Sequence, residues 1–253
     1  DLHSTVMVVK AGPKGEWHAQ PDNGTFCLWF NGKDMFPDTG SYVYEGDAEQ
    51  NRQRAWFKQS RVHNTMTLDN KNFETTQSKT LLWNADGNVP TLVTENPSYK
   101  DFTHRRTVFF VDQKYFVIVD EALGSATGTV NLHFGFDPSK MVTDTANGII
   151  RTDNSGPRNI FLQCVSTDKA ELKEEEGWFS EVYRTKEKRP AYSINIAKGE
   201  KPVRTVTLIY PEKKDDTVKF TAKIVKADDN RLEVRVSVNG EKKDLKWNIT
   251  TNQ

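Results

Sequence analysis

A group of residues able to bind a metal ion or to transfer a proton lies in the first quarter of the sequence. Its members are His18, Gln20, Asp22, Asp38 and His63. Residues two apart face the same side of a strand, so His18 and Gln20 point into one site if their segment is extended. Gln20, Asp38 and His63 then offer an amide oxygen, a carboxylate and an imidazole to a divalent ion. Mixed nitrogen and oxygen ligation suits zinc or manganese, whereas calcium prefers oxygens throughout.

Each of these residues also has an ordinary structural interpretation. A histidine in an apolar segment is commonly buried, with its ring hydrogen-bonded to a backbone carbonyl. An aspartate in a Pro-Asp-Thr-Gly sequence, as at Asp38, is commonly a turn residue. From the residue types alone, both the metal site and a purely structural role stand as interpretations.

The elements that must position these residues are predicted to be strands. Short apolar runs rich in Val, Thr, Phe and Tyr recur along the chain and are separated by Gly, Pro, Asn or Asp, which is the pattern of strands and turns. These runs cover 25–30, 65–68, 80–83, 91–95, 107–111, 115–119, 129–136, 159–165, 191–196 and 203–210. Helical periodicity is nearly absent, and no repeat of fixed length is visible. The sequence therefore predicts an all-β fold, a large antiparallel, supersandwich-like β-sandwich with few or no helices.

The chain is expected to form a single domain over residues 1–253. Residues 106–119 predict a hairpin, and Asn147-Gly148 and Asn239-Gly240 are turn signals because both residue types tolerate a positive φ. After about residue 212 the sequence becomes more polar, yet 218–225 and 232–238 alternate again. We expect these segments to be closing strands of the same domain or a small appended module.

The composition limits the classes of partner. The 35 Lys and Arg residues balance the 35 Asp and Glu residues, so no whole-molecule field attracts nucleic acid or an anionic membrane. No run approaches the roughly 20 apolar residues that a membrane-spanning helix needs. Cys27 and Cys164 lie in apolar runs and are expected to be small buried hydrophobic residues rather than a disulfide or a reactive thiol, which leaves the cellular compartment open.

Several segments together resemble the C-terminal β-sandwich of the heparinase II/III group of polysaccharide lyases. The segments are His18-x-Gln20-x-Asp22-x-Gly24-x-Phe26, Asp38-x-Gly40-x-Tyr42, His63-Asn64-Thr65, and residues 104–106, 115–120, 177–180 and 207–211. The similarity spans at least residues 17–211. Within the group, the sequence is most similar to heparinase III of Bacteroidota, the heparan-sulfate lyase that has glutamine at the position of Gln20.

The resemblance implies a role for each member of the group. His18 matches a catalytic histidine, and Gln20, Asp38 and His63 match the ligands of one structural divalent ion, whether zinc, manganese or calcium. A glutamine at position 20, where relatives have histidine, should lower the affinity for zinc. The family combines its sandwich with an N-terminal α/α toroid, which carries the carboxylate-binding asparagine and the main acid/base tyrosine. This chain lacks the toroid, so the fragment alone is expected to be inactive.

The resemblance also implies a substrate, heparan sulfate or heparin, which the enzyme cleaves by β-elimination at uronic acid. A site that binds a sulfated uronan needs basic residues, because the polysaccharide is a polyanion. Arg54 and Arg105 are candidates for substrate binding. A periplasmic or secreted location follows from the family. Two alternatives are a carbohydrate-binding or structural sandwich without chemistry, and a lyase domain for another uronan such as alginate or hyaluronan.

Overall fold

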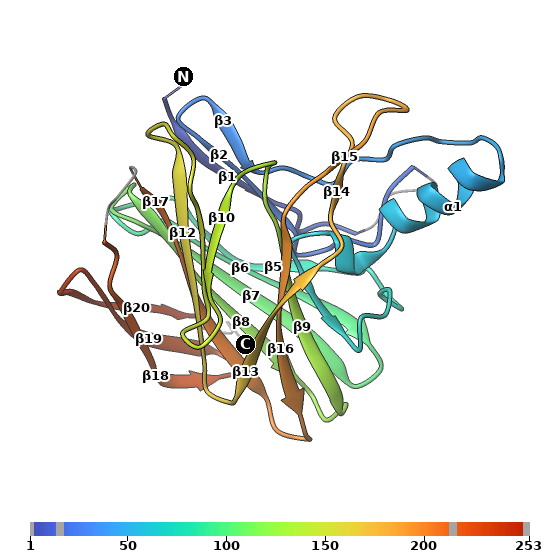
Figure 1. Ribbon diagram of the computed structural model, residues 1–253. Helices are drawn as coiled ribbons and strands as arrows, with labels where there is room; N and C mark the ends of the chain where they lie inside the picture. The colour runs from blue at the N-terminus through green and yellow to red at the C-terminus, as the bar shows by residue number, and fades with distance from the viewer. Residues whose placement is uncertain (1–2, 14–17, 213–216, 250–253) are drawn as a thin grey trace.

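The computed structural model describes residues 3–13, 18–212 and 217–249 and confirms the predicted all-β sandwich (Figure 1). Every named strand pairing is antiparallel. The described residues form one α-helix, α1, and one short 3-10 helix, η1. None of the helices in the described ranges is long and apolar enough to cross a membrane.

The central layer is an eight-stranded sheet. Its strands, in spatial order, are β10 (Met141–Asp144), β11 (Ile149–Thr152), β12 (Asn159–Ser166), β17 (Val203–Glu212), β8 (Tyr115–Leu123), β7 (Phe102–Val111), β6 (Thr91–Tyr99) and β5 (Lys79–Asn84). The predicted hairpin is confirmed as β7 and β8. Phe116 and Ile118 of β8 contribute to one hydrophobic core, whereas Val117 and Val119 contribute to a second. Both faces of the sheet are therefore buried, which explains the continuous apolar runs in its strands.

A four-stranded sheet covers one face of the central layer. Its strands are β13 (Ala170–Glu175), β16 (Ala191–Lys198), β9 (Gly128–Gly135) and β4 (Met66–Leu68). Leu132 of β9 and Ile194 of β16 lie in the same core as Phe116 and Ile118. These two sheets form the sandwich.

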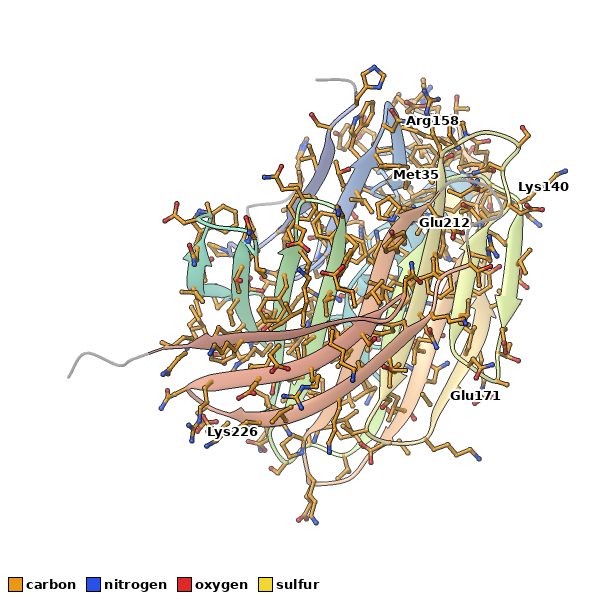
Figure 2. The ribbon with its side chains drawn as sticks, turned by 90° about the vertical axis from the view of Figure 1, so that its left-hand side faces the viewer. Met35, Lys140, Arg158, Glu171, Glu212 and Lys226 are labelled. Carbon is orange, nitrogen blue, oxygen red and sulfur yellow. The ribbon has the colours of Figure 1, made fainter. Side chains whose placement is uncertain are left out.

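A separate three-stranded sheet covers part of the other face. It consists of β18 (Phe220–Asp228), β19 (Arg231–Val238) and β20 (Glu241–Asn248), and Figure 2 shows these strands running crosswise over the central sheet. Val234 and Trp247 pack into the second core, and the Trp247 Nε1–H donates a hydrogen bond to Thr107 Oγ1 of β7 at 2.9 Å. The turn between β19 and β20 has Asn239 at φ 52° and Gly240 at φ 88°, as the Asn-Gly signal predicts.

The remaining elements gather at one end of the sandwich, at the top in Figure 1. They are β1 (Thr5–Val9), β2 (Phe26–Phe30) and β3 (Lys33–Phe36), α1 (Ala48–Phe57), η1 (Ser60–Val62), and the short pair β14 (Trp178–Phe179) and β15 (Glu187–Lys188). Asp47 caps α1 in a reciprocal capping box with Gln50, at 2.9 and 3.0 Å. This end carries the group of residues that the sequence singles out.

Candidate metal and catalytic site

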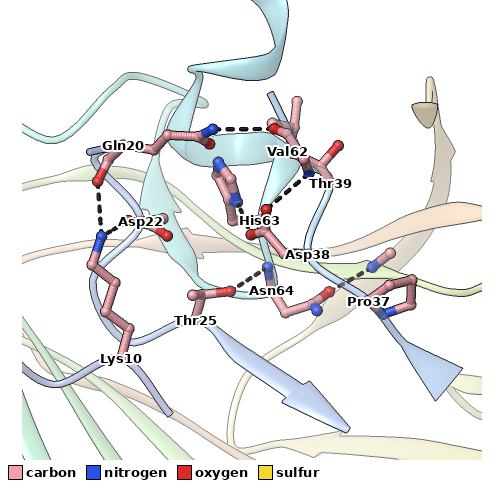
Figure 3. A network of polar contacts seen from close by, with 12 residues as sticks. Lys10, Gln20, Asp22, Thr25, Pro37, Asp38, Thr39, Val62, His63 and Asn64 are labelled. Atoms are coloured by element: carbon pink, nitrogen blue, oxygen red, sulfur yellow. Dashed lines mark hydrogen bonds and ion pairs between the residues drawn. The ribbon is translucent and has the colours of Figure 1, made fainter. Parts of the chain in front are cut away.

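Three segments that are far apart in the chain converge at this end (Figure 3). The first is the loop between β1 and β2, the second follows β3, and the third begins at His63, directly after η1. Backbone bonds from Lys10 N to Thr25 O and from Gly24 N to Lys10 O, both 2.9 Å, close the base of the first loop. Because of this closure, residues in the loop are held over the ends of β2 and β3.

Asp38 and His63 form the centre of the site. His63 Nδ1 lies 3.0 Å from Asp38 Oδ2, and the Gly40 N–H donates to Asp38 Oδ1 at 2.8 Å. The His63 side chain is 0% exposed and the Asp38 side chain 42%. Burial raises the pKa of Asp38, but its contact with His63, the Gly40 N–H and the charge of Arg189 outweigh burial and hold this pKa at about 2. Asp38 is therefore a carboxylate, open to solvent on one side.

The turn that presents Asp38 requires glycine at position 40. Gly40 has φ +83°, and a Cβ there would lie 2.2 Å from the backbone oxygen of Ser180. The close approach belongs to the bridge between Gly40 and Ser180, which joins this turn to the segment after β14. A side chain at position 40 would therefore move the turn and Asp38 with it.

Gln20 and Asp22 lie beside this pair. Asp22, Asp38 and His63 each offer a ligand atom, and these three atoms lie within 4.8 Å of one another. The Gln20 side-chain N–H donates to Gly40 O at 3.1 Å, and Lys10 Nζ contacts both Asp22 Oδ1 and, at 3.1 Å, Gln20 O. Asp22 lies in the sequence motif but was not among the predicted ligands. The sequence feature that could have indicated Asp22 as a ligand is its spacing of two residues from Gln20.

The donor set fits a divalent cation. Gln20 Oε1 and His63 Nε2 are buried and have no hydrogen-bond partner among the described residues. Two carboxylates, an amide oxygen and an imidazole offer the mixed oxygen and nitrogen ligands that zinc and manganese accept, and the oxygens also suit calcium. The structure therefore brings the three predicted ligands together and adds Asp22 to them.

His18 lies at the exposed rim of the same loop. The segment does not form the strand that would align His18 with Gln20, because residues 18–21 are turn and irregular structure. The His18 ring instead packs against Tyr44, with ring centroids 4.8 Å apart, and Tyr44 stacks on Tyr183 at 5.9 Å. Both tyrosines are about half exposed. This aromatic contact was not predicted from the sequence, since it joins segments separated by more than 20 residues.

The two predicted substrate-binding arginines lie in different environments. Arg54 belongs to α1, its guanidinium lies 5.3 Å from the Tyr44 ring centroid, and it donates to Ser41 O at 3.3 Å. Arg105 lies on β7 beneath the three-stranded sheet, where it is 5% exposed and donates to Glu95 Oε1 at 2.7 Å. The structure thus places Arg54, which is buried, against the tyrosine that contacts His18, and leaves Arg105 in an ion-paired interior position.

A buried arginine connects the site to the central sheet. Arg106 Nε donates to Asp120 Oδ1 at 2.7 Å, while its Nη1 donates to the backbone oxygens of Gly24 and, at 2.7 Å, of Asn64. His104 Nε2 lies 2.6 Å from the same Asp120 oxygen. Burial raises the pKa of Asp120, but Arg106 and His104 outweigh it and hold the pKa at about 2. Arg106 therefore fixes two of the converging loops by their backbone oxygens.

Two further side chains, which had no predicted role, hold the segments in place. Asn64 donates to Phe26 O at 2.8 Å and accepts from the Gly135 N–H at 2.7 Å. Arg189 donates to Pro37 O at 2.7 Å and to Val62 O at 3.1 Å. Asn64 lies in the predicted His63-Asn64-Thr65 motif, but no local pattern marks Arg189.

The environment of the cysteines matches the prediction for Cys164 but only in part for Cys27. Both are free, with Cys164 buried and Cys27 partly buried. Burial raises the pKa of Cys27 to about 11 and that of Cys164 to about 12. Neither thiol is therefore activated as a nucleophile.

Sequence comparison identifies the family. A family model described as Heparinase II/III-like, C-terminal, matches residues 2–247. The chain belongs to this family. Among relatives of this heparinase II/III-like chain, a heparin-sulfate lyase of Bacteroides stercoris is 49% identical over 97% of the chain. A heparin-sulfate lyase of Pedobacter heparinus is 36% identical over 95% of it.

Solved structures of the heparinase II/III group have the same fold. A structure described as a heparinase III gene product matches 98% of this chain with a TM-score of 0.95 and 53% identity. The heparan sulfate lyase HepC of Pedobacter heparinus matches 98% with a TM-score of 0.92 and 35% identity. The chain spans only 38% of the Bacteroides relative and 40% of the HepC chain. This heparinase II/III-like chain therefore corresponds to one part of longer proteins.

Proposed function

We propose that this chain is the β-sandwich part of a heparan-sulfate lyase that cleaves its substrate by β-elimination at uronic acid. The observation that carries the proposal is the exposed imidazole of His18 on the loop between β1 and β2, the same loop that brings Asp22 within 4.8 Å of Asp38 and His63. The relatives described as heparin-sulfate lyases support the reaction class.

The reaction sets the groups that the complete site needs. A base removes the proton from C5 of the uronate, the electrons of that bond form the C4–C5 double bond, and the C4–O bond breaks. A donor must neutralise the uronate carboxylate, and an acid must protonate the leaving oxygen. His18 is suited to accept or relay the C5 proton because an imidazole nitrogen can accept a proton and donate it again. The other two groups belong to the toroid of the parent protein, so we expect the isolated chain to be inactive.

A structural divalent ion is the second part of the proposal. Gln20, Asp38 and His63 would hold it, and Asp22 would add a second carboxylate within 4.8 Å of Asp38 and His63. The two carboxylates lie close together, and the positive charge of a bound ion would balance their repulsion. Zinc, manganese and calcium are the candidates. Its role would be to hold the loop on which His18 lies, rather than to bind substrate.

Arg54 is the proposed substrate-binding arginine. Its guanidinium lies against Tyr44, which in turn contacts His18, so a cation is close to the proposed catalytic imidazole. Sulfate and carboxylate groups on the sugar chain complement that charge. Arg105 is not proposed to bind substrate, because Glu95 already neutralises its charge beneath the three-stranded sheet.

We also propose a periplasmic or secreted location for the parent enzyme, on the basis of the family.

The decisive experiment replaces His18 in the parent protein with its toroid intact. We expect His18→Ala to lower the rate of unsaturated uronate formation from heparan sulfate by at least about 100-fold, the typical minimum for a lost acid–base group. Ultraviolet absorbance of the product measures this rate. His3→Ala is the matched control, because His3 is also exposed but contacts Asn31 outside the site.

Other outcomes would favour the two alternatives. Full activity in the His18→Ala enzyme, together with tight binding of heparan sulfate by the isolated chain, would support a carbohydrate-binding sandwich instead. Activity confined to alginate or hyaluronan would keep the elimination chemistry and change the substrate. Parallel assays of the wild-type parent on all four uronans, including heparin, separate these cases.

A further inference from the structure

The outward face of the three-stranded sheet, formed by β18, β19 and β20, carries an excess of basic side chains. Val234, Val236 and Leu245 point inward to the second core. Successive side chains of a strand point to opposite faces, so the residues that alternate with these three, and their partners in register on β18, point outward. The charged residues that point outward are Lys223, Lys226, Asp228, Arg231, Glu233, Arg235, Lys242, Asp244 and Lys246. Six cations therefore share this face with three carboxylates.

The other outer sheet of the molecule has the opposite balance of charge. On β13, Leu172 points to the first core, so Glu171, Lys173 and Glu175 point outward. Asn131 and Asn195, on the neighbouring strands β9 and β16, are uncharged. The whole chain has equal numbers of basic and acidic residues. Its charges are therefore segregated, and the three-stranded sheet is the outer sheet that favours an anionic partner.

Two of the three carboxylates on the basic face are already neutralised within it. Arg231 Nε donates to Asp228 Oδ2 at 2.8 Å, and Arg235 Nε donates to Asp244 Oδ1 at 2.6 Å. Glu233 is the third carboxylate. The cations that remain are four exposed lysines, and within the described ranges none of them forms an ion pair. We call them the lysine set, which consists of Lys223, Lys226, Lys242 and Lys246.

The register of the strands places the lysine set on both sides of β19. Lys226 of β18 and Lys246 of β20 are both paired in register with Glu233, one on each side of it. Neighbouring strands lie roughly 4.8 Å apart, so roughly 10 Å separates the backbones of these two lysines. Lys223 lies directly opposite Arg235, and like charges in this position destabilise a sheet. A bound anion would balance this repulsion.

We propose that this basic face is a second binding surface for the anionic polysaccharide, at a distance from His18. The inference rests on the proposed function, which supplies the polyanion. Sulfate and carboxylate groups of a chain lying along β19 would contact the lysine set on either side. In Figure 1 the three-stranded sheet lies at the lower left and α1 at the upper right, and Figure 2 shows the sheet, with Lys226, as an outer layer.

A long polysaccharide chain can occupy both places at once. A chain that is held on the basic face has a raised effective concentration at the site near His18, because the second contact becomes intramolecular. A short oligosaccharide gains less from this effect. The basic face should therefore favour cleavage of long chains over short ones.

Binding of the parent protein to immobilised heparan sulfate tests the face directly. The His18→Ala background prevents cleavage during the measurement. We expect glutamine at all four positions to weaken binding at low salt by at least about tenfold, the scale of several exposed ion pairs. The four substitutions are Lys223→Gln, Lys226→Gln, Lys242→Gln and Lys246→Gln. Arginine at the same positions keeps the charge and should keep the affinity.

Lys173→Gln is the matched control, because Lys173 is an exposed lysine on the outward face of the other outer sheet. It should bind heparan sulfate as the unsubstituted protein does. Unchanged affinity in the glutamine variant would overturn the proposal. An equal loss in Lys173→Gln, or in the arginine variant, would also overturn it, because the loss would then depend neither on this face nor on its charge.

Cleavage by the parent enzyme with His18 intact gives a second measurement. We expect the glutamine variant to lower kcat/KM more for polymeric heparan sulfate than for a heparan-sulfate tetrasaccharide, because the longer chain gains more from a second contact. An equal loss on the two substrates would place the lysine set in the cleft itself and refute a separate surface. No loss on the polymer would refute it as well.

The same measurements separate failure of this inference from failure of the proposed function. Weaker binding by the glutamine variant, in a parent enzyme that forms no unsaturated uronate from heparan sulfate, would support the basic face and reject the lyase. Normal cleavage, with binding unchanged in the glutamine variant, would keep the lyase and reject the basic face. Duplex DNA and phosphatidylserine vesicles are the alternative polyanions. If the glutamine variant loses binding to either of these but not to heparan sulfate, the face has a different partner and the proposal is wrong.

Discussion

The His104–Asp120 pair and the His63–Asp38 pair have the same chemical groups in contrasting surroundings. The side chains of His104 and Asp120 are 1% and 0% exposed, and Arg106 completes the pair with an ion pair to Asp120. In the second pair, the Asp38 side chain is 42% exposed and His63 Nε2 lacks a protein partner. One pair has used its hydrogen-bonding capacity within the protein, whereas the other keeps atoms available for a ligand.

The closed pair has a structural role. Arg106 is a buried cation whose charge balances Asp120, and burial lowers the pKa of His104, so that its ring remains neutral beside them. The same Arg106 holds the backbone of Gly24 and Asn64, which are near neighbours of Asp22 and His63 in the chain. The closed pair therefore helps to position the open pair, through the backbone oxygens that Arg106 binds.

The largest expected effect comes from breaking the closed pair. Asp120→Asn leaves Arg106 buried without its counter-charge, and we expect the free energy of unfolding to fall by about 3–5 kcal/mol. Guanidinium-induced unfolding, followed by circular dichroism, measures the change. The matched Asp38→Asn variant should lose much less. Equal losses in the two variants would show that the open pair is as important to stability as the closed one.

The sequence predicted the layers of the fold better than it predicted the surroundings of these pairs. The run from Tyr115 to Val119 predicts β8 because five consecutive apolar residues fit a strand buried on both faces. The helix α1 was not predicted, because its exposed polar residues form no apolar stripe and only the Asp47–Gln50 capping box marks its start.

The environment of Arg105 shows why charged residues are harder to interpret. Alternation along β7 places Arg105 on the face opposite to His104 and Arg106, where a two-layer sandwich would leave it exposed. The strands β18, β19 and β20 cover that face, and Trp247 lies 5.5 Å from its guanidinium. No local pattern in β7 indicates this covering layer. The candidate ligands Gln20, Asp38 and His63 were predicted through a family resemblance for the same reason, since their proximity depends on contacts such as Gly40 with Ser180.

A smaller effect is expected in the pH dependence of the free energy of unfolding, to which the closed pair contributes. In the folded protein the pKa of His104 lies below its ordinary value of 6.5. As the pH falls below 6.5, the unfolded chain binds that proton first, so stability decreases, by at most about 1.4 kcal/mol per pH unit for one proton. Asp120 adds a second loss as the pH falls from 3.8 through about 2, because its carboxylate is stabilised only when ionised.

Thermal unfolding measured from pH 7 to pH 5 tests the contribution of His104. We expect His104→Gln to flatten the decline in melting temperature over this range, whatever its effect on stability at pH 7. His3→Ala, which removes an exposed histidine, should leave the slope as in the wild type. A His104→Gln protein with the full wild-type slope would assign the decline to other groups.

Asp38→Asn should have the smallest effect on the free energy of unfolding and the largest effect on metal binding. Asp38 is more than one-third exposed, so Asp38→Asn should change the free energy of unfolding by about 1 kcal/mol or less. The same substitution removes a charged ligand from the proposed ion, and isothermal titration with zinc, manganese and calcium should show binding to the wild type and its loss in the variant. Asp34→Asn is the control, since this neighbouring carboxylate on β3 lies outside the Asp22, Asp38 and His63 cluster.

If the wild type binds none of the three ions, or Asp38→Asn binds them equally well, the open pair is not a metal site. If only Asp38→Asn fails to bind, its near-normal stability shows that the lost affinity reflects a missing ligand, because a damaged fold would also have unfolded more readily.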